Sequence, residues 1–344
     1  MHVINDFLSS FIGKLLQGVS VKRVLRDVRA KEPGEKIQRL HLTNRQDIKN
    51  ICSQYGISPS SSLNLHSEDI TSVEAWVAAE KHVGGKALFY KAQGNPYENL
   101  EDDDFILVIQ TSYQKEAFLN FGEDRICIDS THGTTGYDFN LTSIFVVDDL
   151  EQGLPVAFCI STRVNHQTMS VFFNAVKERS RSMICNAFMS DDAPVFKNAW
   201  IEVMGLPKRI LLCTWHVDRA WQGRLKKVKN EEVRKEVYRQ LKVVAEELKK
   251  DQFEVMFNSF LEKLVKDEET KDFGEYLSSH YSNRREQWAY AYRVHCKLNV
   301  NMYLEAFHKT FKYLYQGGKQ NKRVDKCIAS LIEYMDDREQ DKAN

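Results

Sequence analysis

Three acidic residues, Asp129, Asp191 and Glu305, stand where their carboxylates could share a metal ion. Asp129 closes the apolar run 126–129, and Asp191 follows the apolar run 187–189, so each is expected at the end of a buried strand. Open α/β sheets bind their ligands beyond the carboxyl ends of the strands. Two adjacent carboxylates repel each other unless a cation lies between them, and hard oxygen ligands suit Mg²⁺ or Mn²⁺. If the two strands are neighbours, the sequence predicts a divalent-cation site.

Each acid also has a purely structural interpretation. If an acid is considered alone, the structural interpretation is the better one. Asp129 could cap a turn through the backbone. Asp192 suits the N-cap of a helix at 195–204, which leaves the carboxylate of Asp191 without a capping role. Glu305 could pair with Lys309 on a solvated helix face.

The third acid lies on a predicted helix at 299–315. Helical spacing gives this segment an apolar stripe and, along its flank, a polar stripe that contains Glu305. We therefore expect Glu305 at the rim of the core. The apolar stripe is Leu304, Phe307, Phe311 and Leu314, and the polar one is Asn301, Glu305, His308 and Lys312.

Cys213 and His216 form a Cys-x2-His pair at the end of a further predicted strand. As a zinc site this is only half of the ligand set, because no second pair follows at a usual spacing and His295-Cys296 carries little weight. We expect a structural or DNA-facing role beside the carboxylates. The basic side chains that follow could contact phosphates, and a solvated helix face explains them equally well. They are Arg219, Arg224, Lys226, Lys227 and Lys229, with Trp215 and Trp221 between them.

The elements around these residues predict an α/β fold. The order strand-strand-strand-helix-strand-helix-strand runs from residue 126 to 213, with tight turns between the first three strands. Tight turns require antiparallel pairs, whereas helical connections allow parallel ones, so we expect a mixed five-stranded sheet with flanking helices. Residues 217–298 read as an all-helical insertion. We therefore predict a helical N-terminal region at 1–57, a connecting α+β region at 58–118, and a main domain at 119–344.

The composition excludes a globally disordered chain and a membrane-spanning one. Of 344 residues, 42% are hydrophobic and 28% charged, which excludes global disorder, and no apolar stretch is long enough for a membrane span. The formal net charge is zero, yet residues 1–50 carry ten basic and five acidic side chains, so a nucleic-acid partner is not excluded. Seven cysteines without a CxxC pair argue for a reducing compartment.

Four ordered blocks together resemble the transposase domains of Mutator-like elements (MULE), especially the animal branch that includes the RNase H-like domain of SWIM zinc-finger (ZSWIM) proteins. The first block runs from 128 to 158, the second is Ser190-Asp191-Asp192, the third is Cys213-x2-His216, and the fourth is 301–307 with Lys309 and Lys312. The resemblance covers roughly residues 112–316.

This resemblance implies an RNase H-like fold and a DDE triad of Asp129, Asp191 and Glu305 that holds two Mg²⁺ or Mn²⁺ ions. It implies metal-dependent DNA strand cleavage and transfer at transposon ends and target DNA, a nuclear location and a homo-oligomer. Arg219, Arg224, Lys226, Lys227, Lys309 and Lys312 would contact DNA, and Cys213 and His216 are the family signature.

Two other functions remain open at this level. One is a non-catalytic, transposase-derived nuclear protein that binds DNA or other proteins. The other is an RNase H-type nuclease that cleaves RNA–DNA hybrids. The chain lacks the C-x-C…C-x-H pattern of a SWIM zinc finger, so we do not expect zinc in it. Residues 21–30 and 44–55 could form a helix-turn-helix-like DNA reader, or the N-terminal region could simply be a plain bundle of three helices.

Overall fold

The computed structural model describes residues 68–296 apart from Val83, residues 302–318 and 323–342, and a few isolated residues before 68. The helical region predicted at 1–57, with its helix-turn-helix interpretation, lies almost entirely outside the described residues. Within the described part of the chain, no helix is both long and apolar enough to cross a membrane.

A seven-stranded mixed sheet forms the centre of the molecule, in the order β1-β2-β5-β4-β3-β6-β7. As predicted, β3, β4 and β5 are antiparallel, whereas β6 is parallel to β3 and β7 to β6. The sheet has two strands more than predicted because β2 pairs with β5 and β1 with β2. The strands are β1 (Ala87–Lys91), β2 (Ile106–Ile109), β3 (Arg125–Thr131), β4 (Asn140–Val147), β5 (Gly153–Ser161), β6 (Ala187–Ser190) and β7 (Ile210–Leu212).

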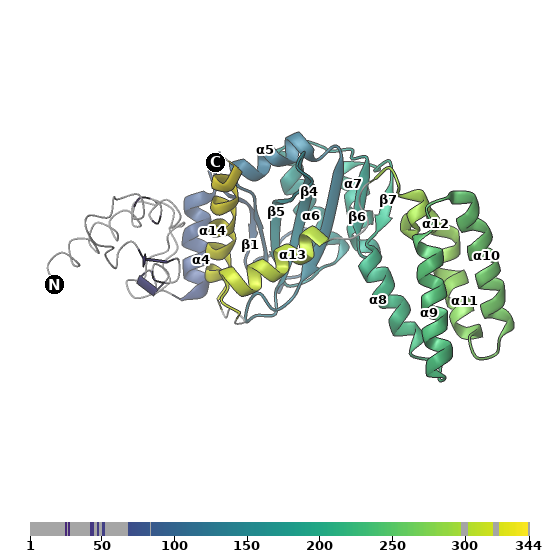
Figure 1. Ribbon diagram of the computed structural model, residues 1–344. Helices are drawn as coiled ribbons and strands as arrows, with labels where there is room; N and C mark the ends of the chain where they lie inside the picture. The colour runs from purple at the N-terminus through teal and green to yellow at the C-terminus, as the bar shows by residue number, and fades with distance from the viewer. Residues whose placement is uncertain are drawn as a thin grey trace.

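Helices cover both faces of this sheet. Helices α6 and α7 lie on one face, and α13 crosses the other (Figure 1). The ring of Phe307 on α13 packs on Phe145 of β4 and Phe158 of β5, with ring centroids 5.3 and 5.6 Å apart. The helices are α4 (Asp69–Glu80), α5 (Ser112–Phe121), α6 (His166–Arg179), α7 (Pro194–Met204), α13 (Met302–Thr310) with a π-helical turn η4 (Phe311–Tyr315), and α14 (Val324–Lys342).

A bundle of helices extends from the β7 edge of the sheet, where the sequence predicts the insertion (Figure 1). Its core is a hydrophobic cluster separate from that of the sheet, built around Trp288, whose indole contacts the rings of Trp221, Phe253 and Phe257. The bundle can therefore hold its own shape. It contains α8 (Thr214–Leu225), α9 (Glu231–Glu246), α10 (Lys250–Lys266), α11 (Lys271–Tyr281), η2 (Ser282–Arg284), α12 (Arg285–Trp288) and η3 (Tyr290–Tyr292).

Candidate active site at the ends of β3 and β6

The two aspartates stand at equivalent positions on neighbouring strands. In the parallel pair β3–β6, the last register partners are Cys127 and Met189. Asp129 lies two residues after Cys127, still within β3. Asp191 lies two residues after Met189, directly beyond the end of β6. Because side chains alternate along a strand, an even step returns to the same face. Both aspartates therefore lie at one edge of the sheet, near enough for the charge of Asp191 to raise the pKa of Asp129.

The face that carries Asp129 is the one that α13 covers. Asp129 lies opposite Ser143 on β4, and Ser143 lies opposite Phe158 on β5. Residues directly opposite each other in a ladder share a face, and Phe158 stacks on Phe307 of α13. Glu305 precedes Phe307 by two residues on the same helix. Glu305, the third acid, therefore lies on a helix, α13, that packs on the sheet face of Asp129.

Burial and mutual repulsion set the protonation of Asp129. Its side chain is 8% exposed, and burial raises its pKa to about 7, with smaller contributions from the negative charges of Asp191 and Glu305. The backbone N–H of Ser130, which donates to Oδ1 at 2.9 Å, acts in the opposite direction. Asp191 and Glu305 thus both lie close enough to Asp129 for their charges to act on it, and carboxylates perturbed in this way are typical of functional clusters.

The other two carboxylates are also desolvated. Burial raises the pKa of Asp191, and burial likewise raises the pKa of Glu305. Glu305 Oε1 is buried and accepts no hydrogen bond from the described residues. Lys309 is exposed, and it forms no ion pair with Glu305, so the solvated i,i+4 pair considered from the sequence does not form. Buried polar atoms are nearly always satisfied, so Glu305 Oε1 has capacity to accept from a further partner.

Two histidines lie beside the acids. Burial lowers the pKa of His216, although the negative charge of Asp191 acts to raise it. Burial also lowers the pKa of His308 to about 3, helped by the positive charge of Lys312. Both rings are therefore neutral at neutral pH. His216 Nδ1 and His308 Nε2 are buried, and no described residue hydrogen-bonds to either. The cluster thus contains two nitrogen atoms with unused hydrogen-bonding capacity.

Lys312 ties α13 and its π-helical turn to the end of β3. Its ammonium donates to Thr131 Oγ1 at 2.7 Å and to the carbonyl of His132 at 2.8 Å. Burial lowers its pKa. The residue predicted from the sequence as a DNA contact is therefore half-buried and holds two parts of the site together. π-Helical turns often occur at functional sites.

The Cys-x2-His signature divides between two environments. Cys213 is fully buried in the sheet core, caps the start of α8, and its N–H donates to Ser190 O at 2.9 Å. His216 lies one helical turn further along α8, near enough to Asp191 to act on its pKa electrostatically. Among the residues that the structure describes, no group of three or more His, Cys, Asp or Glu side chains is arranged so that it could hold a metal ion.

The N-cap predicted for α7 is wrong. Asp192 does not cap the helix: Ala193 occupies the N-cap without a side-chain hydrogen bond, and Pro194 begins the helix. Asp191 Oδ1 instead accepts the N–H of Ala193 at 3.1 Å. Asp192 forms a bidentate ion pair with Arg284, at 2.5 and 2.6 Å. This contact joins residues far apart in the sequence, and no local signal predicts it.

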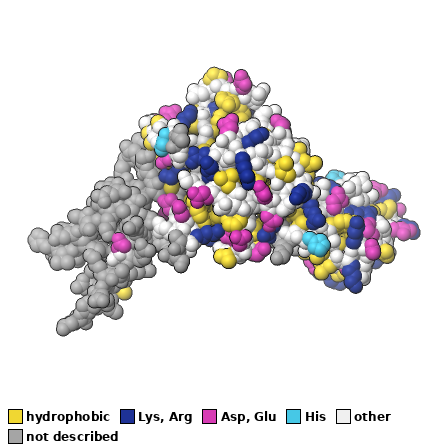
Figure 2. Space-filling model, turned by 90° about the horizontal axis from the view of Figure 1, so that it is seen from above, with side chains coloured by type: hydrophobic (Ala, Val, Ile, Leu, Met, Phe, Trp, Pro, Cys, Tyr) yellow, Lys and Arg dark blue, Asp and Glu magenta, His cyan; other side chains and the backbone are white. Residues whose placement is uncertain are grey.

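The predicted DNA-contacting residues on α8, and those that follow its end at Leu225, differ in accessibility. The Arg219 guanidinium lies 5.3 Å from the ring centre of Trp215, which is 41% exposed. Arg224 lies over the ring of Tyr276 and is half-buried. Lys226 and Lys227 are exposed. Basic side chains also lie on the body of the sheet domain and on the bundle in the view of Figure 2.

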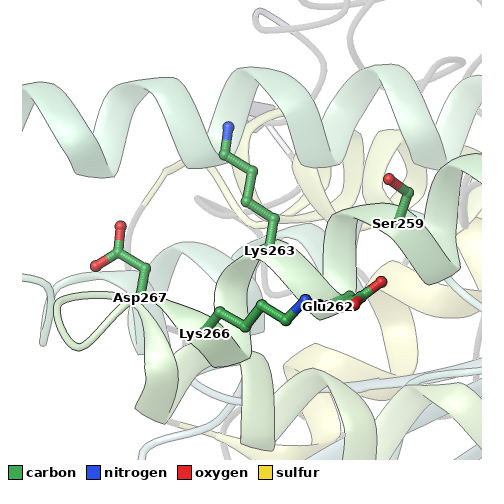
Figure 3. Close-up of a pocket in the computed structure, with 5 residues that line it drawn as sticks. All are labelled: Ser259, Glu262, Lys263, Lys266 and Asp267. Atoms are coloured by element: carbon green, nitrogen blue, oxygen red, sulfur yellow. Dashed lines mark hydrogen bonds and ion pairs between the residues drawn. The ribbon is translucent and has the colours of Figure 1, made fainter.

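The hollow shown in Figure 3 lies apart from the acids. It has a volume of about 420 Å³ and is lined from α10 and the residue after it. Lys266 pairs with Glu262 at 2.5 Å there, so its charge is balanced locally. None of the predicted site residues contributes to this hollow. Its lining is Ser259, Glu262, Lys263, Lys266 and Asp267.

Comparison with known families agrees with the sheet topology. Residues 93–195 match the family described as zinc finger SWIM domain-containing protein 1/3, RNaseH-like domain. The match spans β2 to β6 and includes Asp129 and Asp191, whereas Glu305 lies beyond it. A search of curated proteins found no match to the chain. The chain thus contains an RNase H-like domain related to that of SWIM zinc-finger proteins, which confirms this part of the resemblance, while the link to MULE transposases stays a prediction.

Proposed function

We propose that the chain is a metal-dependent DNA strand-cleaving and strand-transferring enzyme of the MULE transposase type, with Asp129, Asp191 and Glu305 as its triad. The observation that carries the proposal is the position of the three carboxylates. Asp129 lies in β3 and Asp191 directly follows the neighbouring parallel strand β6, while Glu305 is on the helix that covers the face of Asp129. The charges of Asp191 and Glu305 both raise the pKa of Asp129.

The donor set fits hard divalent cations. The three acids supply oxygen atoms, Glu305 Oε1 is buried and unpartnered, and Asp129 has a raised pKa that a nearby cation would lower again. Mg²⁺ or Mn²⁺ bound by these side chains would activate an attacking water or 3′-hydroxyl and stabilise the leaving oxygen. The side chains would have to move closer together than they are here.

The protein itself supplies position and surroundings. Lys312 holds the end of β3 against α13, and the neutral rings of His216 and His308 border the acids without adding positive charge that would compete with cations. Along α8, Trp215 with Arg219 and then Lys226 and Lys227 lead outward from His216, and we propose that this surface holds the DNA backbone. The partner would be transposon-end and target DNA, in the nucleus, bound by a homo-oligomer.

A second function has its own support. The matched family is a domain of proteins named for a zinc finger, not for an enzymatic activity. A transposase-derived protein could keep this fold to bind DNA or another protein in the nucleus without cleaving it. Such a protein would retain the surface along α8 but would bind Mn²⁺ weakly.

The deciding experiment is strand cleavage with purified chain and Mn²⁺. Labelled duplex DNA, single-stranded DNA and an RNA–DNA hybrid are offered side by side, to the wild type and to Asp129→Asn, Asp191→Asn and Glu305→Gln. We expect DNA cleavage that each substitution lowers by at least ~100-fold, because removing one carboxylate removes charge that balances the cation. Asp149→Asn, at an exposed acid, is the matched control and should cleave normally.

Each alternative predicts a different result. Cleavage that persists in Asp129→Asn would contradict the proposal. DNA binding without cleavage, and with no Mn²⁺ binding by calorimetry, would favour the non-catalytic function. Preferential cleavage of the hybrid would favour an RNase H-type nuclease.

A further inference from the structure

We propose that Arg284, from the helical bundle, is a positioning residue for Asp191, which makes the bundle part of the site. The inference rests on the proposed function of the three acids. Arg284 ends η2, and both of its terminal nitrogens donate to Asp192, at 2.5 Å to Oδ1 and 2.6 Å to Oδ2. Asp192 directly follows Asp191, so the contact reaches the turn that carries the second acid.

The bundle holds the Arg284 side chain in place on its own side. Its Nε–H donates to the carbonyl of His280, and its guanidinium lies 5.1 Å from the centre of the Tyr281 ring. Tyr281 is 1% exposed and packs edge-on against Trp221 and Trp288 in the core of the bundle. The fork of Arg284 is therefore fixed to a rigid element before it meets Asp192, which favours a defined geometry over a mobile surface contact.

The turn that receives this contact is otherwise held by short-range hydrogen bonds. After β6 ends at Ser190, Ser190 Oγ donates to the Asp191 carbonyl at 2.8 Å, Asp191 Oδ1 accepts the N–H of Ala193, and α7 begins without a side-chain cap. The direction of the Asp191 carboxylate thus depends on a short turn whose middle residue is Asp192. A bidentate clamp on that residue restricts the turn and so restricts Asp191.

The clamp also acts through charge. The negative charge of Asp192 is one of the causes that raise the pKa of Asp191, and Arg284 supplies the opposing positive charge directly. The side chains of Arg284 and Asp192 are 27% and 40% exposed, so the pair contributes little to overall stability. Its role is the placement of one carboxylate.

A second contact joins the bundle to the same edge of the sheet. Arg293 is 1% exposed, and its guanidinium donates to the carbonyl of Leu212, the last residue of β7. It also donates to Gln287 O at 2.8 Å within the bundle. The bundle thus contacts the sheet beyond the end of β6 and at the end of β7. Of these two contacts, the one from Arg284 reaches the turn that carries Asp191.

A charge exchange tests the clamp. Arg284→Asp and Asp192→Arg are made singly and together, and Mn²⁺ affinity is measured by calorimetry on the full chain. Each single variant should weaken Mn²⁺ binding by roughly tenfold, and the double variant should recover to within roughly threefold of wild type. Arg285→Ala, which removes an ion pair to Glu254 inside the bundle, is the matched control and should bind Mn²⁺ normally.

Hydrogen–deuterium exchange of the metal-free chain provides a readout that does not depend on the proposed chemistry. Peptides covering residues 187–196 should exchange faster in each single variant and return to the wild-type rate in the double variant. Unchanged exchange in folded single variants, or no recovery in the double variant, would overturn the clamp. If wild type binds no Mn²⁺ but the exchange pattern is as expected, the proposed function fails while the positioning of the turn stands.

Discussion

Tyr303 on α13 contacts Gly153 at the start of β5 so closely that the glycine has no room for a side chain. A methyl group at Gly153 would lie 2.2 Å from Tyr303 Cβ and 2.6 Å from its Cγ. Since Glu305 lies two residues along the same helix, this approach sets the distance of the third acid from the sheet. Glycine is required here for close packing of helix on strand.

Substituting Gly153 by alanine should therefore move the helix. We expect Gly153→Ala to cost ~1–3 kcal/mol of unfolding free energy by overpacking and to lower Mn²⁺-dependent cleavage more than that loss explains. Urea denaturation and the cleavage assay measure the two effects. Gly223→Ala is the matched control, because Gly223 lies in α8 with nothing within 4 Å of the added methyl. It should be neutral or slightly stabilising.

The charge of Asp129 should make the stability of the protein depend on pH. Its pKa is about 7 in the folded chain and near 4 in the unfolded one, so the folded state binds the proton more tightly. This contribution favours folding fully below pH 4 and is lost as the pH rises towards 7. Asp129→Asn should thus raise stability at pH 8 by on the order of 1–4 kcal/mol and change it little at pH 4. Thermal denaturation at the two pH values measures this, and an equal effect at both would contradict the assignment.

Removing the ammonium of Lys312 should loosen α13 from β3. Lys312→Met leaves Thr131 Oγ1 and the His132 carbonyl without this donor while keeping most of the side-chain volume. We expect a loss of ~1–3 kcal/mol of unfolding free energy and cleavage at least tenfold lower at equal folded protein. Lys326→Met, at an exposed lysine of α14, serves as the control. Equal activity of the two variants would show that the tether does not position Glu305.

The surface along α8 should bind DNA through its phosphates. Lys226→Ala with Lys227→Ala should weaken binding to all DNA sequences alike and reduce the slope of log affinity against log salt by about 2, one for each lost phosphate contact. Fluorescence anisotropy between 50 and 200 mM salt measures the slope. A pair of exposed lysines on α10, Lys263→Ala with Lys266→Ala, should leave it unchanged.

The sequence predicts the local elements of this fold well, because alternation and apolar runs report directly on burial. The five predicted strands between residues 126 and 213 and the antiparallel-then-parallel order are all present. The addition of β1 and β2 to the same sheet was not predictable, because a strand's own pattern does not specify its partner. The π-helical turn at the end of α13 was also not predictable, because the apolar stripe from Leu304 to Leu314 continues a helical spacing. The turn changes that spacing, and Leu314, expected on the stripe, is 55% exposed.

In the candidate site, too, the features set by neighbouring residues were predictable, and the contacts between distant residues were not. Strand-end aspartates can be recognised from the runs that precede them, so the proximity of Asp129 and Asp191 follows once their strands are neighbours. The role of Asp192 was predicted wrongly because a helix-capping residue and a partner for a distant arginine have the same side chain. Arg284 could not be found at all, since its partner lies 92 residues earlier and no motif connects the two.

The delivery of Glu305 by α13, after the bundle, has a consequence for biosynthesis. The ribosome releases both aspartates and then the whole bundle before it releases the helix that packs on Phe145 and Phe158. A nascent chain at that stage can fold its bundle around Trp288, yet it presents an aromatic sheet surface to solvent. Synthesis thus passes through a stage that exposes apolar surface and lacks the third acid, and arrest within the bundle would leave a product prone to aggregation.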